Sequence, residues 1–405
     1  MSSNSSRDFE KAAASLGDII VRIVKRIESF WQRVTEGIAV QLLWSQFMSE
    51  ARASYSLYTQ EIDWEALRKE SRGRRFRKTT SALFWAMLMK LSPARRVFLL
   101  IALFFAIVAL TNSQVTISSS GHDRTFLFNT PNNFLPVLLA VAALLFLLAL
   151  ELADRVTMKR DLEIAREIQR WLVPESPPEV PRVEIAFVSR PANTVGGDYY
   201  DAFLRASPDS KSNSKRLLVV VADVAGKSVP AALLMATFQA SLRTLAATHT
   251  SLLELVEGLN RYACAHSLGG RRFTTAFFGE LELETRVLSY VRAGHNAPLI
   301  RRATGSIERL EVGDLPLGVD REARFTCAAA TMGPRDLLVV FTDGLVEAVN
   351  DADQEFGEFR LLEALKSSDA AGAQSTLKNL LSAVDAYVGH ARQHDDLTCL
   401  LLRTG

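Results

Sequence analysis

Two uninterrupted apolar stretches constrain the fold of this 405-residue chain more than any other feature. They are Val97–Leu110 and Phe134–Leu150, and neither contains a charged side chain. A helix needs about 20 residues to cross the ~30 Å hydrocarbon core of a membrane, and both stretches reach that length only with Thr111–Val115 and Glu151–Leu152 included. We therefore predict a two-pass transmembrane hairpin at 95–152. A pair of buried core helices is the alternative, but no nearby segment offers a surface that could bury two such apolar helices.

Basic residues set the expected orientation of this hairpin, because positively charged flanks stay on the cytoplasmic side. The connecting segment 112–133 holds one basic residue, Arg124. Those that flank the hairpin are Arg72, Arg74, Arg75, Arg77, Lys78, Lys90, Arg95 and Arg96 before it, and Arg155, Lys159 and Arg160 after it. We expect the connector to lie outside and both termini to lie in the cytoplasm. The first 30 residues contain no long apolar run, so no N-terminal signal peptide is expected.

Charge and cysteine content narrow the classes of function. The formal net charge of +2 gives no reason to expect a nucleic acid as partner. Cys264, Cys327 and Cys399 lie far apart and form no CxxC pair. This spacing argues against a disulfide framework or a zinc ribbon and fits a reducing compartment, with each cysteine acting as a small buried apolar residue.

Helical segments are expected on both sides of the hairpin. Residues 1–90 read as several amphipathic helices in the cytoplasm, and their role stays open between membrane-surface binding and oligomerisation. Residues 153–180 form a linker in which the helical pattern continues without a breaker to Pro174. Four apolar residues of this linker lie near heptad spacing, namely Met158, Leu162, Ala165 and Leu172. They fit either a short coiled coil, and hence a homodimer, or a helix packed on the next domain.

Residues 181–405 have the pattern of a compact α+β domain. Strand-like apolar runs occur at 217–222, 275–283, 287–292, 337–342 and 397–403, and helix-like runs occur at 230–247, 252–266 and 376–390. The helices come in pairs and do not alternate strictly with the strands. This order favours sheets with helices on their outer faces over a doubly wound nucleotide-binding fold.

Four turns of this domain carry an aspartate where chemistry is expected. Asp223 and Asp343 each end an apolar run, Asp198 follows two glycines, and Asp395 precedes the last run. A carboxylate at the tip of an apolar strand is costly unless a positive charge compensates it. Each aspartate alone is also compatible with a structural turn.

Clustered carboxylates with few histidines suit Mg²⁺ or Mn²⁺ better than zinc. Two such ions would lower the pKa of a bridging water and hold phosphate oxygens for in-line attack. The sequence contains no GxSxG, HExxH or GxxxxGK[ST] motif that would indicate a serine hydrolase, a zincin or a P-loop enzyme.

Polar residues near these aspartates have more modest expected roles. We expect Asp201 to make local hydrogen bonds without binding metal, and Asp396 to orient the aspartate before it. His295, in a predicted hairpin, is interpreted as structural and not as a substrate ligand. Lys227 and Arg271–Arg272 could attract phosphate, although solvated surface charge is the simpler interpretation.

Taken together, these segments resemble the bacterial SpoIIE/RsbU-type phosphatases, which belong to the metal-dependent protein phosphatase (2C-like) superfamily. The resemblance covers residues 160–404, and its segments occur in the expected order. They are AREIQ at 165–169, LVP at 172–174, VGGDYYD at 195–201, ADVAGK at 222–227, PAALLM at 230–235, TTAF at 274–277, AGHNAP at 293–298, LPLG at 315–318, FTDGLVEA at 341–348 and DDLT at 395–398. One local departure is Ser228, where family members often have a glycine.

The resemblance implies an αββα sandwich with two Mn²⁺ or Mg²⁺ ions between its sheets. By position, Asp198 and Asp223 would be the catalytic residues that bridge or bind the ions, and the Val224 carbonyl would be a backbone ligand. Asp343 and Asp395 would complete the site. The resemblance also implies a phosphoserine or phosphothreonine protein as substrate, often an anti-sigma-factor antagonist of the STAS type, and hence a bacterial inner membrane around the hairpin. The helix before the domain commonly relays a signal in such proteins.

Two other functions share many of these features. A membrane receptor or scaffold could use a phosphatase-like domain only to bind a partner, but such a domain would tend to lose unpaired carboxylates. A phosphatase for small phosphorylated metabolites would share the metal site and differ in its substrate surface. The sequence as a whole favours a membrane-anchored, metal-dependent phosphoprotein phosphatase.

Overall fold

The structure is a computed structural model of the chain. It describes residues 92–405 except 112–113, 121–122, 130–133, 207–214, 250, 267–271 and 368–371. The amphipathic helices predicted within 1–90 lie outside the described residues. The chain divides into two compact units, Met1–Leu152 and Ala153–Gly405.

Two apolar helices occupy the stretches where the sequence predicts membrane spans. They are α5 (Pro93–Thr111) and α6 (Phe134–Leu172), and both are long and apolar enough to cross a membrane. Many of their large side chains are exposed, with Leu110 at 74% and Phe134 at 79%. Because few of these side chains are buried within the protein, the two helices differ from the core helices of a soluble domain.

Contacts near one end of α5 join it to α6. The rings of Phe98 and Phe146 have their centroids 4.9 Å apart, and Arg95 forms an ion pair with Glu151 at 3.2 Å. The connection between the helices holds an antiparallel hairpin, β1 (Gln114–Ser120) and β2 (Asp123–Asn129). Beyond its apolar part, α6 continues as a helix to Leu172, as its unbroken sequence pattern predicts.

The second unit contains two five-stranded antiparallel sheets, with strand orders β10-β7-β6-β5-β4 and β3-β12-β11-β8-β9. The strands of the first sheet are β4 (Tyr199–Ala206), β5 (Lys215–Val224), β6 (Thr274–Glu282), β7 (Val287–Ala293) and β10 (Ala328–Thr331). Those of the second sheet are β3 (Val183–Arg190), β8 (Leu299–Arg301), β9 (Ile307–Arg309), β11 (Leu337–Phe341) and β12 (Leu397–Thr404).

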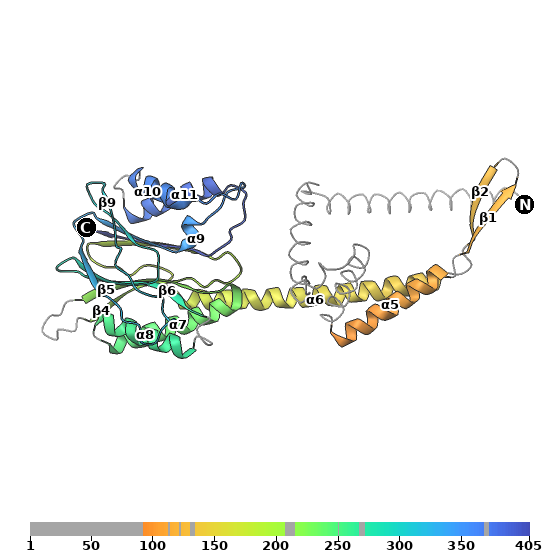
Figure 1. The fold of residues 1–405 in the computed structure, drawn as a ribbon, viewed down its shortest axis with the longest axis horizontal. Helices are drawn as coiled ribbons and strands as arrows, with labels where there is room; N and C mark the ends of the chain where they lie inside the picture. Colours follow the sequence, from red (N-terminus) through yellow and green to blue (C-terminus); the bar gives the residue numbers. More distant parts are fainter. Residues whose placement is uncertain are drawn as a thin grey trace, which may run out of the picture. The chain divides into compact units, whose positions relative to one another are not determined.

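Helices cover the outer faces of the two sheets. They are α7 (Ser228–Thr248), α8 (Leu252–His266), α9 (Asp343–Val346), α10 (Gly357–Ser367) and α11 (Ala373–Val388). Figure 1 shows α7 and α8 along one side of this unit and α10 and α11 along the opposite side, with the strands between them. This is the αββα sandwich that the sequence resemblance implies.

Strand β5 is apolar at successive positions because both of its faces are buried. Leu218 and Val220 pack in the core under α7 and α8, whereas Leu217, Val219 and Val221 alternate with them and pack in the core between the two sheets. A third core lies between the second sheet and α9–α11. A strand that is buried on both faces loses the polar alternation of a surface strand.

The five predicted strands and three predicted helices of this unit are confirmed, with ends that differ by a few residues. Five strands were not predicted, and two of them, β8 and β9, have three residues each. The expectation for the cysteines holds for Cys399, which is buried. It is wrong for Cys327, which is exposed and directly precedes the edge strand β10.

Candidate metal centre

The strand ends place four aspartates at one end of the two sheets. Asp198 directly precedes β4, and Asp223 is the second-last residue of β5. Asp343 begins α9 after β11, and Asp395 lies two residues before β12. Because β4 pairs with β5 and β11 pairs with β12, the first two carboxylates are neighbours in one sheet and the last two are neighbours in the other.

Mutual repulsion between these carboxylates appears in their pKa values. Burial, followed by repulsion from Asp223, holds the pKa of Asp198 well above its usual range. Burial and repulsion from Asp343 and Asp395 raise the pKa of Asp223 to about 7. Burial and repulsion from Asp395 also raise the pKa of Asp343. The four side chains therefore form one cluster with an excess of negative charge, a setting in which perturbed pKa values accompany function.

The Lys227 side chain enters this cluster. The Lys227 ammonium lies 2.9 Å from the Asp395 carboxylate and donates a hydrogen bond to the His394 carbonyl at 2.9 Å. It also lowers the pKa values of Asp223 and Asp343 electrostatically. The interpretation of Lys227 as solvated surface charge is therefore incomplete, because this side chain is exposed but paired.

The turn after Asp223 is fastened by a second basic residue. Arg272 donates a hydrogen bond to the Ala225 carbonyl at 3.1 Å, so its interpretation as solvated surface charge is wrong. Arg271 lies outside the described residues. In the same turn Gly226 has a φ of 122° and Ser228 a φ of 62°. A left-handed conformation costs a residue other than glycine about 1–2 kcal/mol, so Ser228 holds a conformation that a glycine would adopt without strain.

Asp396 fixes the loop that carries Asp198. Its carboxylate accepts hydrogen bonds from the backbone amides of Ala192 at 2.7 Å and Gly197 at 2.6 Å. A Cβ atom on Gly196 would overlap this carboxylate, so glycine is needed there for the close approach. The Asp396 carboxylate therefore orients the loop before Asp198 and not Asp395, contrary to the expectation from the sequence; the Asp396 backbone amide, and not its side chain, donates to the Asp395 carboxylate at 2.9 Å.

Two further groups approach Asp198. The buried Thr342 hydroxyl donates to the Asp198 carboxylate at 2.9 Å and accepts a hydrogen bond from the Thr398 amide at 2.9 Å. No role was predicted from the sequence for Thr342, although it directly precedes Asp343. The Val224 carbonyl oxygen would lie 2.8 Å from a Cβ on Gly197, which brings that predicted backbone ligand next to the same loop.

Asp201 lies apart from the four aspartates. Its buried carboxylate accepts hydrogen bonds from Arg243 of α7 at 2.8 and 2.7 Å and from the Tyr199 hydroxyl. His295 is also buried, with Nδ1 3.1 Å from the Thr275 hydroxyl. Burial lowers the pKa of His295 to about 4, so its imidazole is neutral at pH 7. Both residues therefore have the local contacts expected of structural groups.

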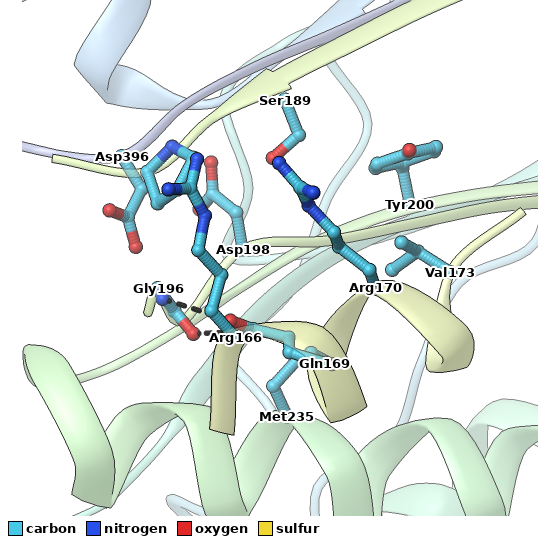
Figure 2. Close-up of a pocket in the computed structure, with 11 residues that line it drawn as sticks. Arg166, Gln169, Arg170, Val173, Ser189, Gly196, Asp198, Tyr200, Met235 and Asp396 are labelled. Carbon is cyan, nitrogen blue, oxygen red and sulfur yellow. Dashed lines mark hydrogen bonds between the residues drawn. The ribbon is translucent and has the colours of Figure 1, made fainter. Parts of the chain in front are cut away.

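The last turns of α6 form one wall of a cavity beside Asp198. Arg166, Gln169 and Arg170 border it from the helix, and Asp198 and Asp396 border it from the opposite side. Figure 2 shows Arg166 and Arg170 extending from the helix toward the side of Asp198 and Ser189, while Gln169 turns to Gly196. No role was predicted from the sequence for Arg166 or Arg170, although the two share one helical face by their spacing.

The donor atoms at this end of the sheets fit hard divalent cations. All the candidate ligands are carboxylate or carbonyl oxygens, the preferred ligands of Mg²⁺ and Mn²⁺, and the raised pKa values reflect negative charge that a cation would compensate. In the described part of the chain, however, no three histidine, cysteine, aspartate or glutamate side chains are placed so that they could hold one ion together. The fit is therefore one of donor chemistry, with the ammonium of Lys227 currently paired to one of the candidate ligands.

Comparison with known proteins agrees with this arrangement. Residues 213–405 match the family described as Stage II sporulation protein E (SpoIIE). Protein IcfG of Synechocystis sp. is 27% identical over 280 residues, which cover 63% of this chain and 43% of IcfG. Phosphoserine phosphatase RsbU of Bacillus subtilis is 25% identical over 248 residues, which cover 61% of this chain and 70% of RsbU. This chain thus spans less than half the length of IcfG.

A solved structure supports the fold in particular. The SiaA-PP2C domain of Pseudomonas aeruginosa superposes with a TM-score of 0.54 at 19% identity, over 62% of this chain and 99% of that domain. The SpoIIE match at 213–405 lies within the unit that carries the aspartate cluster. The unit Ala153–Gly405 therefore contains a segment similar to the SpoIIE family, and the chain is similar in sequence to the phosphoserine phosphatase RsbU and in fold to a PP2C domain.

Proposed function

We propose that this chain is a membrane-anchored, metal-dependent phosphatase that hydrolyses phosphoserine or phosphothreonine on a protein. The observation that carries the proposal is the convergence of Asp198, Asp223, Asp343 and Asp395 at one end of the two sheets. The raised pKa values of the first three support it, because such a cluster calls for bound cations.

Asp198, Asp223, Asp343, Asp395 and the Val224 carbonyl would hold two Mg²⁺ or Mn²⁺ ions. When bound, such ions supply a water of lowered pKa as nucleophile and stabilise negative charge on the phosphoryl group. The chain's own residues position this centre. Thr342 donates to Asp198 and so fixes the orientation of its carboxylate, and Asp396 holds the preceding loop through two backbone amides.

The similarity to RsbU supports the proposed substrate class. RsbU is a phosphoserine phosphatase by name, and the resemblance implies an anti-sigma-factor antagonist of the STAS type as the phosphorylated partner. A phosphatase for small metabolites would use the same aspartates. Comparing kcat/KM on a phosphopeptide and on p-nitrophenyl phosphate separates these two substrate classes.

Membrane anchoring rests on α5 and α6. Their length, their exposed apolar side chains and the basic residues that flank them support two membrane spans with both termini in the cytoplasm. The continuous helix from Phe134 to Leu172 then offers a route for a membrane signal to reach the phosphatase unit. A homodimer through the apolar residues at 158–172 would use the same helix.

The decisive experiment uses the full-length protein in detergent. We expect hydrolysis of a phosphoserine peptide with Mn²⁺ or Mg²⁺, loss of this activity with EDTA, and a fall of at least about 10²-fold in kcat for Asp343→Ala, the size of effect seen when a preorganised electrostatic group is removed. Metal-independent activity, or an unchanged Asp343→Ala variant, would contradict the two-metal proposal. A protein that binds no metal and hydrolyses nothing would favour the scaffold, for which the Lys227–Asp395 ion pair would be the resting arrangement.

A further inference from the structure

A small cavity next to Asp198 is bordered by two arginines that the metal centre does not use. Its volume is about 200 Å³, and Arg166 and Arg170 line it from α6. Pockets for drug-sized ligands measure about 300–1,000 Å³. The cavity therefore suits a single side chain with a small headgroup better than a whole small-molecule ligand.

Hydrogen bonds hold this part of α6 in a defined position. Gln169 donates to the Gly196 carbonyl at 2.7 Å, and the Gly196 amide donates back to the Gln169 side chain at 3.2 Å. The Tyr200 hydroxyl donates to the carbonyl of Pro174, just beyond the helix, at 3.2 Å. The helix is thus attached to the loop that leads into Asp198. Arg166 and Arg170, which flank Gln169 in the sequence, are placed at the cavity by the same contacts.

The charges around the cavity favour an anion. Neither the Arg166 nor the Arg170 guanidinium has a hydrogen-bond or ion-pair partner within the described ranges, although Asp198 and Asp396 border the same cavity. Asp396 directs its oxygens to backbone amides, and Asp198 accepts its hydrogen bond from Thr342. The two guanidinium groups are therefore available to a ligand. A planar guanidinium matches phosphoryl oxygens with two parallel hydrogen bonds.

The position of the cavity selects the phosphoryl group over other acidic groups of a protein substrate. The cavity reaches Asp198, so a ligand in it lies at the edge of the aspartate cluster. Carboxylates elsewhere on a substrate would have no reason to approach these aspartates, whereas the phosphoryl group must approach them to be hydrolysed.

On these grounds we propose that Arg166 and Arg170 of α6 bind the phosphoryl group of the phosphoserine or phosphothreonine substrate. This proposal rests on the proposed function and adds the side chains that hold the substrate's charge. It also makes phosphate binding depend on the position of α6, because both cations belong to that helix.

The test measures binding of inorganic phosphate and phosphopeptide kinetics on the full-length protein in detergent with Mg²⁺. Isothermal titration calorimetry compares the wild type with Arg166→Gln, Arg170→Gln and the double variant. Arg160→Gln is the matched control, because Arg160 is an exposed arginine of α6 that does not line the cavity. Thermal unfolding of each variant verifies that the fold is retained. Lysine variants at both positions test rescue by a charge of different shape.

We expect each glutamine variant to weaken phosphate binding about tenfold or more, the scale for loss of a hydrogen bond between charged groups. The KM for the phosphopeptide should rise in parallel with a smaller change in kcat, and the lysine variants should recover part of the affinity. A change of less than about twofold in the double variant would overturn the proposal, and so would an equal loss in Arg160→Gln. A wild type that fails to bind phosphate would also overturn it. A wild type that binds phosphate through these arginines but hydrolyses no phosphopeptide would retain this inference and refute the proposed function.

Discussion

Asp201→Asn separates a structural aspartate from a metal-binding one within the segment VGGDYYD. Asp201 has no exposed surface and forms two hydrogen bonds with Arg243, while the Arg243 side chain is 44% exposed. Breaking a fully buried ion pair costs about 3–5 kcal/mol because the remaining charge is left without a partner. Arg243 can recover water, so we expect a smaller loss of about 2–3 kcal/mol. For a unit of this size, that corresponds to a decrease in Tm of roughly 4–12 °C.

The assay is thermal unfolding followed by circular dichroism, together with titration of Mg²⁺ by calorimetry. Asp385→Asn is the matched control, since Asp385 also binds an arginine, Arg190, through both carboxylate oxygens but is 56% exposed. Exposed pairs contribute about 0–1 kcal/mol, so this variant should change Tm little. Mg²⁺ binding should persist in Asp201→Asn because that carboxylate faces Arg243 of α7. Loss of Mg²⁺ binding with an unchanged Tm would refute the reasoning and identify Asp201 as a ligand.

Four further outcomes are expected. The pKa of Asp223 is raised from 3.8 to about 7, so in EDTA the folded protein binds the Asp223 proton more tightly than the unfolded chain does. The stability that this proton contributes is therefore lost as the pH rises from about 4 past 7. The decrease in Tm between pH 5 and 8 should be smaller in Asp223→Asn than in the wild type, and an equal decrease would contradict the raised pKa of Asp223. Gln169→Leu, which removes both hydrogen bonds to the loop before the metal centre, should lower phosphatase activity with a loss of stability of only about 1–2 kcal/mol, measured by kinetics and urea unfolding. Gly344→Ala should lower both stability and Mg²⁺ affinity, because its Cβ would overlap the Asp396 backbone; calorimetry with unchanged affinity would be inconsistent with this geometry. Ser228→Gly should raise the free energy of unfolding by up to about 1 kcal/mol by relieving the left-handed conformation, and urea unfolding with a decrease would show that the strain is absent.

Local patterns account for the parts of the fold that could be predicted. The residues of β5 are apolar on both faces, and the turn residues after it end the strand, so its position follows from composition and period. The short strands β8 and β9 could not be found in this way, since three residues give no period. The pairing of strands along the two sheets likewise depends on partners that are distant in the sequence.

The candidate site likewise has some features that could be predicted from the sequence and others that could not. The sequence places Asp198, Asp223, Asp343 and Asp395 in turns at strand ends, and the family resemblance groups them. Their electrostatic coupling, however, arises from the packing of two sheets. The role of Thr342 as a hydrogen-bond donor to Asp198 involves residues that lie 144 positions apart, and no local pattern encodes such a contact.

The sequence by itself therefore determined the apolar helices, the strands buried on both faces and the identity of the acidic residues, because each of these is a property of neighbouring side chains. Only the tertiary structure decided that Lys227 pairs with Asp395, that Asp396 serves the loop backbone, and that Arg166 faces the cavity beside the aspartates. These contacts join separate elements, and their geometry depends on how the two sheets and α6 pack together. Packing of this kind is set by the whole domain, since each side chain takes the position that its neighbours leave to it.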